Sequence, residues 1–334
     1  QGGTRSKRGD KMVDAADAAV ETEAANAESG ASARSRKAAS KRRSSTKKSP
    51  MERRQRRAGY VFVAPAMILT AVFFFLPMAF SLWWSFTKYN GVTDPKFVGL
   101  DNYSDLFADD QFRTAAGNTA IFALVTMTIG PLLGLVSALL LNRARVGQAL
   151  FRAAFFLPVT MSLVVVSTMW KMLLNDDGLI NRAIEFFGGE GRQWLSDPDT
   201  ALLAVCAASI WQGFGFETVI LLAALQGIPR ERYEAAAVDG AGPWRTFRAV
   251  TLPALRPALL FVYVVGIIGA FQVYDQVYVM TRGGPADSTM TVVYYLVEKF
   301  HRLDLGHASA AAYLLVIFLA AASALQMRLE RRPS

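Results

Sequence analysis

The sequence predicts an all-α protein that crosses a membrane several times. Hydrophobic residues make up 52% of the 334 residues and charged residues only 19%, a composition unusual for a soluble domain. Six apolar runs are each long enough to cross a hydrocarbon core of about 30 Å as a helix. No alternating pattern that could close a membrane barrel accompanies them, and helices satisfy their own backbone in lipid. We therefore expect a polytopic membrane protein with six transmembrane helices, at residues 60–86, 114–141, 153–174, 201–228, 258–280 and 307–327.

The first 57 residues differ in composition from the rest of the chain. They hold 16 Lys and Arg against 7 Asp and Glu, and this excess equals the net charge of the whole chain, +9. Because they contain few large apolar residues, we expect a disordered basic tail (1–57) before a transmembrane domain (58–330). A basic segment directly before a membrane span is expected to contact anionic membrane lipid rather than nucleic acid. A signal peptide is not expected, because the first apolar run is too long and lacks a cleavage pattern.

The arginines between the runs predict the orientation. Residues 142–152, 227–256 and 328–334 hold 3, 5 and 3 arginines. The opposite connections have a smaller excess of positive charge and several aspartates; they are residues 88–113, 175–200 and 281–306. By the positive-inside rule, the arginine-rich connections and both termini are cytoplasmic.

The segment 227–256, called the polar loop below, is expected to form two short helices joined by a sharp corner. Residues 234–238 are strong helix formers, and Asp239-Gly240 ends that helix. A second short helix is predicted over residues 244–250, with Pro253 and Pro257 marking the entry into the next apolar run. A spacing of three residues puts one set of apolar side chains on a single face of this helix: Trp244, Phe247 and Val250.

The polar loop also carries a recognisable motif. Residues 234–253 read EAAAVDGAGPWRTFRAVTLP, and this pattern resembles the EAA loop in permease subunits of bacterial ABC importers, in particular the sugar-importing, maltose-type branch. The segments FVGLDNYSDLF and TRGGPADST resemble further parts of sugar permeases, so the likeness covers about residues 58–330. In that family the loop is a pair of coupling helices that fits into a cleft of a cytoplasmic ATPase. The resemblance assigns this coupling to Glu234, Ala235, Ala236, Asp239, Gly240, Pro243, Trp244 and Phe247.

The resemblance implies a six-helix, type I ABC importer permease in a bacterial plasma membrane. Its expected partners are a second permease subunit, a dimer of ATPase subunits and an extracytoplasmic sugar-binding protein. ATP is expected to bind to the ATPase subunits, because this chain has no Walker A pattern.

No sequence motif for catalysis or metal binding is present. The chain lacks Gly-x-Ser-x-Gly, His-Glu-x-x-His and paired catalytic carboxylates, so we expect neither an enzyme nor a bound cofactor. His301 and His307 lack Cys or carboxylate partners at metal-ligand spacing, so no metal site is expected. Cys206 lies within an apolar run and is expected to be a small core residue.

Polar side chains inside the apolar runs are the candidates for substrate binding, because a charged group at the bilayer centre costs roughly 2.5–3.5 kcal/mol and is rarely idle. Trp211, Gln212 and Glu217 lie near the middle of the fourth run, and Gln272 and Asp275 lie in the outer half of the fifth. Aromatic rings stack on the CH faces of sugars, and amides and carboxylates bond sugar hydroxyls. These residue types therefore favour a carbohydrate as the substrate.

The resemblance adds four positions at which the family contacts sugar: Gly213, Phe216, Gly266 and Ala270. Only Gly213 keeps the family's residue type, so the sugar specificity does not transfer. Helical spacing puts Phe216 within the arc of about 140° that joins Gln212 to Glu217. A structural role stays open, in which Gly213 and Gly215 let helices pack closely and Trp211 lies in the core.

The sequence thus predicts the permease subunit of an ATP-driven importer for a carbohydrate, a di- or oligosaccharide. One alternative is a self-contained secondary transporter, although the six runs show no convincing repeat. Another is an importer of glycerol phosphate or a different polar solute. A phosphate requires cationic groups in the cavity, and only Lys171 lies inside an apolar run, near its end.

Overall fold

The computed structural model describes residues 50–143 and 147–330. The chain divides into two compact units, residues 1–75 and 76–334. In the first unit, α2 (Pro50–Thr70) leads into a π-helical turn, η1 (Ala71–Phe75). Residues 1–49 of the expected tail lie outside the described residues. Residues 50–57 of that expected tail are helical and belong to α2.

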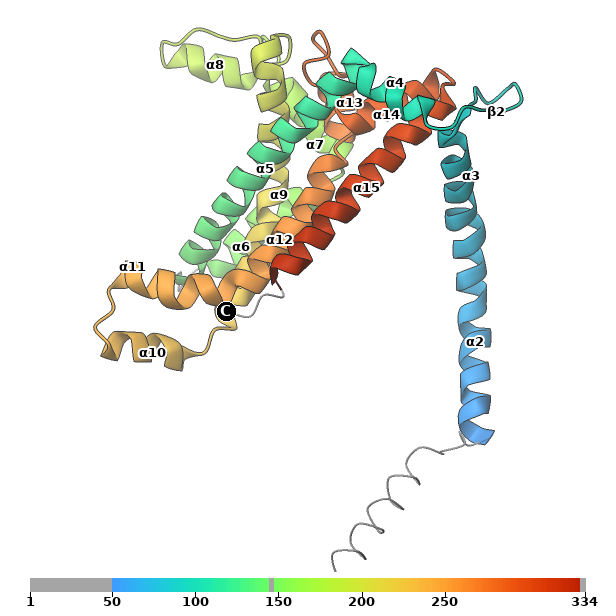
Figure 1. The fold of residues 1–334 in the computed structure, drawn as a ribbon. Coiled ribbons are helices and arrows are strands. Elements are labelled where there is room, and N and C mark those ends of the chain that lie inside the picture. Colours follow the sequence, from blue (N-terminus) through green and yellow to red (C-terminus); the bar gives the residue numbers. More distant parts are fainter. Residues whose placement is uncertain (1–49, 144–146, 331–334) are drawn as a thin grey trace, which may run out of the picture. The chain divides into compact units, whose positions relative to one another are not determined.

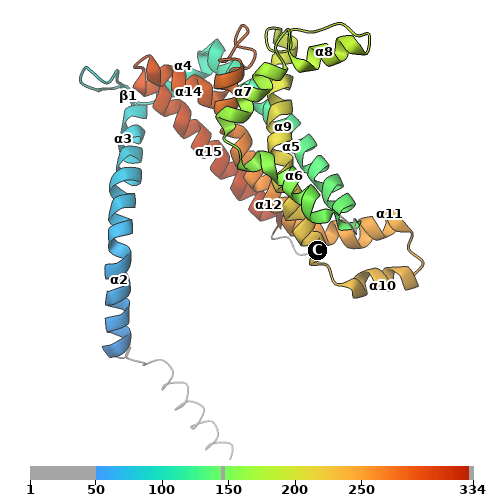
Figure 2. The same ribbon diagram turned by 180° about the vertical axis from the view of Figure 1, so that it is seen from behind.

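The second unit is a helical bundle with shorter helices at its two ends (Figures 1 and 2). Between these ends run α3 (Leu76–Ser85), α5 (Asp110–Arg143), α6 (Gln148–Thr160), α7 (Leu163–Leu173), α9 (Pro198–Gln226), α12 (Leu252–Phe271) and α15 (Leu305–Glu330). One end, called the α8 end, holds α4 (Asp101–Ala108), α8 (Leu179–Phe186), α13 (Asp275–Met280) and α14 (Val292–His301). The other, called the α10 end, holds α10 (Arg230–Val238) and α11 (Pro243–Thr246).

The regular structure of the described residues is helical apart from one short antiparallel ladder. In it β1 (Thr87–Lys88) pairs with β2 (Lys96–Phe97). This confirms the predicted all-α class.

Four of the six predicted spans are helices of membrane-crossing length at the predicted places. They are Tyr60–Ser85, Asp110–Arg143, Pro198–Gln226 and Leu305–Gln326. Their length follows from the uninterrupted apolar composition, which a helix of this kind needs to cross a bilayer.

The third predicted span, 153–174, is not one straight helix. α6 and α7 meet at an angle of 98°. Met161 and Ser162 between them have extended backbones, with ψ of 150° and 135°, and two extended residues interrupt the helical hydrogen bonds. The segment is therefore a broken span or a re-entrant pair.

The fifth predicted span, 258–280, has different boundaries. Its helix starts earlier, at Pro243, and ends at Phe271. Tyr274 leaves helical geometry (φ −138°, ψ −55°), and Asp275 then opens the separate helix α13. Gln272 and Asp275, which were predicted inside the span, thus lie just after α12 and at the start of α13.

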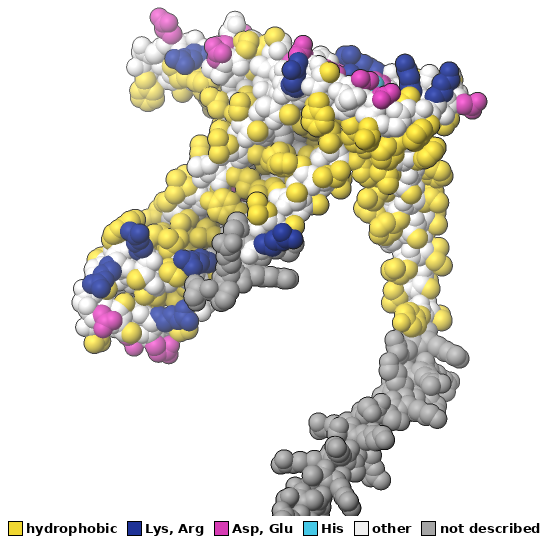
Figure 3. Space-filling model, in the orientation of Figure 1, with side chains coloured by type: hydrophobic (Ala, Val, Ile, Leu, Met, Phe, Trp, Pro, Cys, Tyr) yellow, Lys and Arg dark blue, Asp and Glu magenta, His cyan; other side chains and the backbone are white. Residues whose placement is uncertain are grey.

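Close helix packing holds the centre of the bundle together. α6 approaches α9 at Gly215, where a Cβ would lie 1.8 Å from the carbonyl oxygen of Phe155, so only glycine fits there. Cys206 is 1% exposed within the hydrophobic core, as predicted. Hydrophobic side chains cover the flanks of the bundle, while Lys, Arg, Asp and Glu gather at its two ends (Figure 3). This is the surface pattern of a membrane-spanning protein.

Candidate functional site

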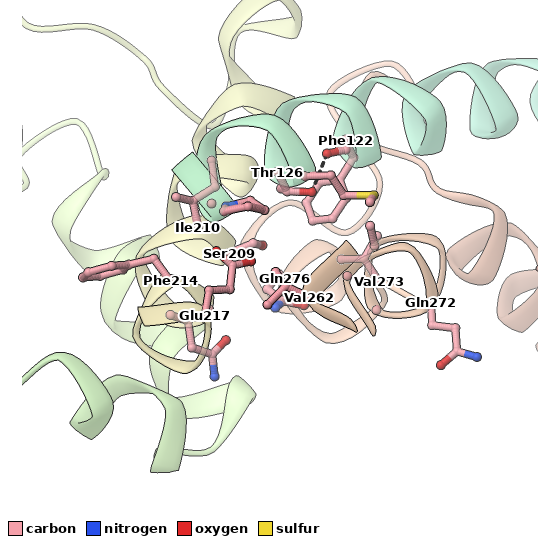
Figure 4. A pocket seen from close by; sticks show the side chains of 18 of the residues that line it. Phe122, Thr126, Ser209, Ile210, Phe214, Glu217, Val262, Gln272, Val273 and Gln276 are labelled. Carbon is pink, nitrogen blue, oxygen red and sulfur yellow. Dashed lines mark hydrogen bonds between the residues drawn. The ribbon is translucent and has the colours of Figure 1, made fainter. Parts of the chain in front are cut away.

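A cavity of about 320 Å³ lies among α5, α9 and α12, and extends to the break before α13 (Figure 4). α5 contributes Phe122, Thr126, Met127, Gly130 and Pro131, and α7 contributes Leu163. α9 contributes Ser209, Ile210, Gln212, Gly213, Phe214 and Glu217. α12, the break and α13 contribute Val262, Tyr263, Gly266, Gly269, Ala270, Gln272, Val273, Tyr274, Asp275 and Gln276. The cavity is thus built by several helices that are far apart in the sequence.

The cavity wall combines aromatic surface with hydrogen-bonding groups. The hydroxyls of Thr126 and Ser209 donate to carbonyls of their own helices, at 2.7 Å and 2.9 Å, which leaves their lone pairs able to accept. Three glutamines add amide groups: Gln212, Gln272 and Gln276. Such a wall can bond many hydroxyl groups and stack on ring faces at the same time.

Glu217 is held in a groove of α5 that two glycines create. A Cβ on Gly130 would lie 3.1 Å from both carboxylate oxygens, and a Cβ on Gly134 would lie 2.8 Å from the Cβ of Glu217. Among the described residues, the buried Oε2 of Glu217 has no hydrogen-bond partner. A buried carboxylate oxygen without a partner is costly, so Glu217 remains a candidate for contact with a solute.

Seven of the nine residues predicted for substrate binding line this cavity: Gln212, Gly213, Glu217, Gly266, Ala270, Gln272 and Asp275. Gly213 has no atom of the described residues within 4 Å of an added Cβ, so it does not pack against a neighbouring helix of this chain as Gly215 does. Trp211 and Phe216 are not in the lining. The ring of Trp211, which is only partly buried, packs edge-on against Trp170, with centroids 5.9 Å apart.

The prediction missed the contribution of α5 and that of Tyr263 on α12. Thr126 and Tyr263 lie in ordinary apolar surroundings in the sequence, where nothing indicates which face they occupy. The Gly130-Pro131 pair in the middle of an apolar run was an available signal, because both residues weaken a helix and are kept in spans for a local reason.

The polar loop lies at the α10 end and begins with a well-capped helix. α10 ends at Val238, and Gly240 has a positive φ of 69°. The N–H of Ala241 bonds the carbonyl of Ala236 at 2.9 Å, and that of Gly240 bonds Ala237 at 3.0 Å. These two bonds form a Schellman motif, in which glycine satisfies the last carbonyls of a helix. The predicted corner at Asp239-Gly240 is confirmed.

The second arm of the loop differs from the prediction. α11 continues through a π-helical turn, η2 (Phe247–Thr251), directly into α12, so the second arm is not a separate short helix. Pro253 and Pro257 do not interrupt this helix: Pro253 follows the π-helical turn by two residues, and Pro257 lies inside α12.

The side chains of the second arm face two ways. The rings of Trp244 and Phe247 stack at 5.7 Å beside the end of α5. Val250, predicted on their face, instead lines the space between the two arms. There the hydroxyls of Tyr233 and Thr251 join the arms at 3.2 Å. All eight residues predicted for coupling lie on the loop, and Trp244 is 72% exposed.

Comparison with known proteins decides the family. Residues 130–334 match the model of the binding-protein-dependent transport system inner membrane component. The chain belongs to this family. The predicted resemblance to importer permeases is thereby confirmed, and the self-contained secondary transporter is disfavoured.

Curated members of this permease family are similar along most of their length. The probable ABC transporter permease protein YesP of Bacillus subtilis is 35% identical over 82% of this chain and 90% of its own. The lactose transport system permease protein LacF of Rhizobium radiobacter is 36% identical over 82% and 94%. The trehalose/maltose transport system permease protein MalF of Thermococcus litoralis is 30% identical over 85% and 97%.

The permease fold is also found in a solved structure. A chain of a bacterial ABC transporter involved in the import of the acidic polysaccharide alginate superposes with a TM-score of 0.73. It is 21% identical, and the match covers 84% of this chain and 97% of that one. The membrane-spanning architecture of the permease is therefore shared with an ABC importer.

Proposed function

We propose that this permease forms part of the translocation pathway of an ATP-driven importer for an uncharged di- or oligosaccharide. Two relatives similar over most of their length are named for lactose and for trehalose and maltose. The observation that carries the proposal is the mixed wall of the cavity, which includes tyrosine and phenylalanine rings together with hydroxyl, amide and carboxylate groups. Sugars need both kinds of contact at once.

The charges of the cavity favour an uncharged solute. Its lining, all within the described part of the chain, includes the carboxylates Glu217 and Asp275 but no Lys, Arg or His. Lys171, the cation considered for a phosphate, bonds the carbonyl of Val279 at 3.2 Å and is not in the lining. An anionic solute such as glycerol phosphate would meet repulsion without a compensating cation.

The size of the cavity suits a shared pathway. Its volume of about 320 Å³ is at the lower end of the roughly 300–1,000 Å³ of small-molecule sites. A second permease subunit would supply the facing wall. This chain contributes Gln212, Gly213, Glu217, Gly266, Ala270, Gln272 and Asp275 in the proposed arrangement, with Tyr263, Tyr274 and Gln276 beside them.

The polar loop is proposed to dock onto an ATPase subunit in the cytoplasm. The arginine distribution supports this orientation, with both termini on the same side. Exposed Trp244, Val238 and Glu234 give the loop the apolar and charged surface that a partner needs. ATP would bind to that partner, and closure of the ATPase pair would move the loop and switch the helices between inward- and outward-facing states.

Transport by the intact complex tests the proposal. The permease would be purified with its partner permease, ATPase and binding protein, and placed in proteoliposomes with a panel of lactose, maltose, trehalose, raffinose and glycerol 3-phosphate. We expect ATP-dependent uptake of at least one uncharged sugar. Gln212→Ala should reduce that uptake several-fold, whereas Gln193→Ala, in the loop before α9, should not. Uptake of glycerol 3-phosphate alone, or equal effects of both variants, would contradict the proposal.

A further inference from the structure

The short helix α8 has a continuous apolar face. At 100° per residue, its apolar side chains and that of the following Phe187 fall within an arc of about 160°. They are Leu179, Ile180, Ala183, Ile184, Phe186 and Phe187. The remaining arc carries Asn181, Arg182 and Glu185. The helix is thus strongly amphipathic, although it stands outside the bundle core.

Much of this apolar face is uncovered. Leu179 is 67% exposed, Phe186 84% and Phe187 86%. The two phenylalanine rings contact only each other among aromatic groups of the described residues, edge to face at 5.4 Å. Contiguous apolar surface of this kind in water indicates an interaction site.

Asn181 fixes which way the apolar face points. Its side chain is 2% exposed, and its Nδ2 donates to the carbonyls of Asp176 at 3.0 Å and Arg192 at 2.9 Å. Its Oδ1 accepts from the indole N–H of Trp194 at 2.8 Å. These bonds tie the polar side of α8 to the segments before and after it. The helix is therefore held with Ile180 against the hydrophobic core and with Leu179, Phe186 and Phe187 exposed.

The position of α8 indicates what covers the face. The helix connects α7, which ends at Leu173, to α9, which begins at Pro198; α9 is long and apolar enough to cross a membrane, and α7 is the second half of the bent apolar pair. It projects sideways from the α8 end of the bundle (Figures 1 and 2). In the α8 region, hydrophobic side chains gather on the side toward the flank of the bundle and charged ones on the opposite side (Figure 3). The apolar face thus continues the lipid-facing flank.

We infer that α8 lies flat in the membrane surface, with its apolar face inserted at the boundary between lipid headgroups and acyl chains. Arg182 and Glu185 then point to the headgroups and water. A protein partner approaching the α8 end from the aqueous side would meet the charged side instead. The apolar face offers no hydrogen-bonding side chain, so it fits a lipid surface better than a specific protein. The inference does not depend on which solute is transported.

Site-specific quenching tests the insertion. The chain has a single cysteine, the buried Cys206, so a Cys206→Ser background accepts one new cysteine at a time. Leu179→Cys and Phe187→Cys probe the apolar face, and Arg182→Cys and Glu185→Cys are matched controls on the polar side. Each full-length variant carries a polarity-sensitive fluorophore in nanodiscs of phosphatidylcholine and phosphatidylglycerol. One quencher is a lipid with a nitroxide near the top of its acyl chain, and the other is aqueous iodide.

We expect the lipid nitroxide to quench the labels at 179 and 187 several-fold more than those at 182 and 185, and iodide to show the reverse order. Strong iodide quenching at all four positions would overturn the inference, because the apolar face would then lie in water. Protection of 179 and 187 from both quenchers would also overturn it, in favour of a protein cover. Because each position is labelled separately, local distortion at one site does not remove the periodic pattern of the others.

Discussion

The carboxylate of Glu217 on α9 lies against the bare backbone of Gly130 on α5. A Cβ on Gly130 would stand 3.1 Å from each carboxylate oxygen. Gly134, one turn further along α5, leaves the same kind of space for the Cβ of Glu217. The pair of glycines therefore lets an ionisable side chain enter the centre of the bundle beside the proposed pathway.

Filling this groove should loosen the bundle. In Gly134→Ala, the new Cβ would lie 2.8 Å from that of Glu217, so α5 and α9 must separate. We expect a loss of about 1–3 kcal/mol of stability, as in overpacked cores, measured by thermal unfolding in detergent. Gly117→Ala is the matched control in the same helix, because nothing lies within 4 Å of its added Cβ. Equal melting temperatures for the two variants would contradict the close approach of Glu217.

Glu217→Gln separates a substrate role from a structural one. If the carboxylate accepts hydrogen bonds from the sugar, its loss should weaken sugar-stimulated ATP hydrolysis by about tenfold, because a hydrogen bond to a charged group contributes about 1.5–3 kcal/mol. Basal hydrolysis and complex assembly should stay unchanged. Phe216→Ala, outside the cavity lining, should leave the sugar response intact. A proportional loss of stimulated and basal rates in Glu217→Gln would remove the residue from the substrate site.

The sequence predicted the features that the membrane or the backbone imposes. Runs such as 114–141 were found because lipid allows only apolar helices of sufficient length. The corner at Gly240 was found because a positive φ is cheap only for glycine. The loop motif identified the family, since many positions agree at fixed spacing.

Features that depend on tertiary packing could not be predicted from the sequence. The bend at Met161 and Ser162 follows no strong local breaker, although Pro158 just before it was a partial signal. Phe216 lies between Gln212 and Glu217 on the predicted arc of α9, yet it is not in the lining, because helical spacing gives the face of a residue but not the rotamer of its side chain. The face of α5 that lines the cavity could not be predicted either, because Thr126 is an ordinary residue in a span and does not indicate a cavity.

A carboxylate at the α8 end should make stability depend on pH. Asp109 accepts hydrogen bonds from Tyr295 at 2.7 Å, from Lys299 at 3.2 Å and from the N–H of Gln111 at 2.8 Å. Burial alone would raise the pKa of Asp109, but these bonds lower it below the ordinary value of 3.8. A lowered pKa stabilises the folded state above the unfolded value, and this contribution disappears as pH falls through the folded value.

Asp109→Asn should therefore lower stability by about 1–2 kcal/mol at neutral pH. The difference from the parent protein should stay constant down to a pH of about 4 and shrink below it. Asp110→Asn is the neighbouring control, because the Asp110 side chain is 92% exposed and should contribute at most about 1 kcal/mol. Thermal unfolding across this pH range provides the measurement. A difference that grows on acidification would contradict the assignment.

Gly240 has a left-handed backbone, which distinguishes it from Gly227 and Gly242 in the polar loop. Gly240→Pro cannot adopt a φ of 69° and loses the N–H that bonds Ala237, so the Schellman motif should be lost and the two arms should change direction. Gly240→Ala has open space for its Cβ and should cost only about 1–2 kcal/mol, from the positive φ alone. Gly242→Ala is the matched control, since its φ of −67° suits any residue and nothing lies within 4 Å of an added Cβ.

We expect membrane insertion in all three variants, with ATPase co-purification and sugar uptake lost in Gly240→Pro, reduced in Gly240→Ala and normal in Gly242→Ala. Full co-purification and uptake in Gly240→Pro would show that the loop does not couple transport to the ATPase.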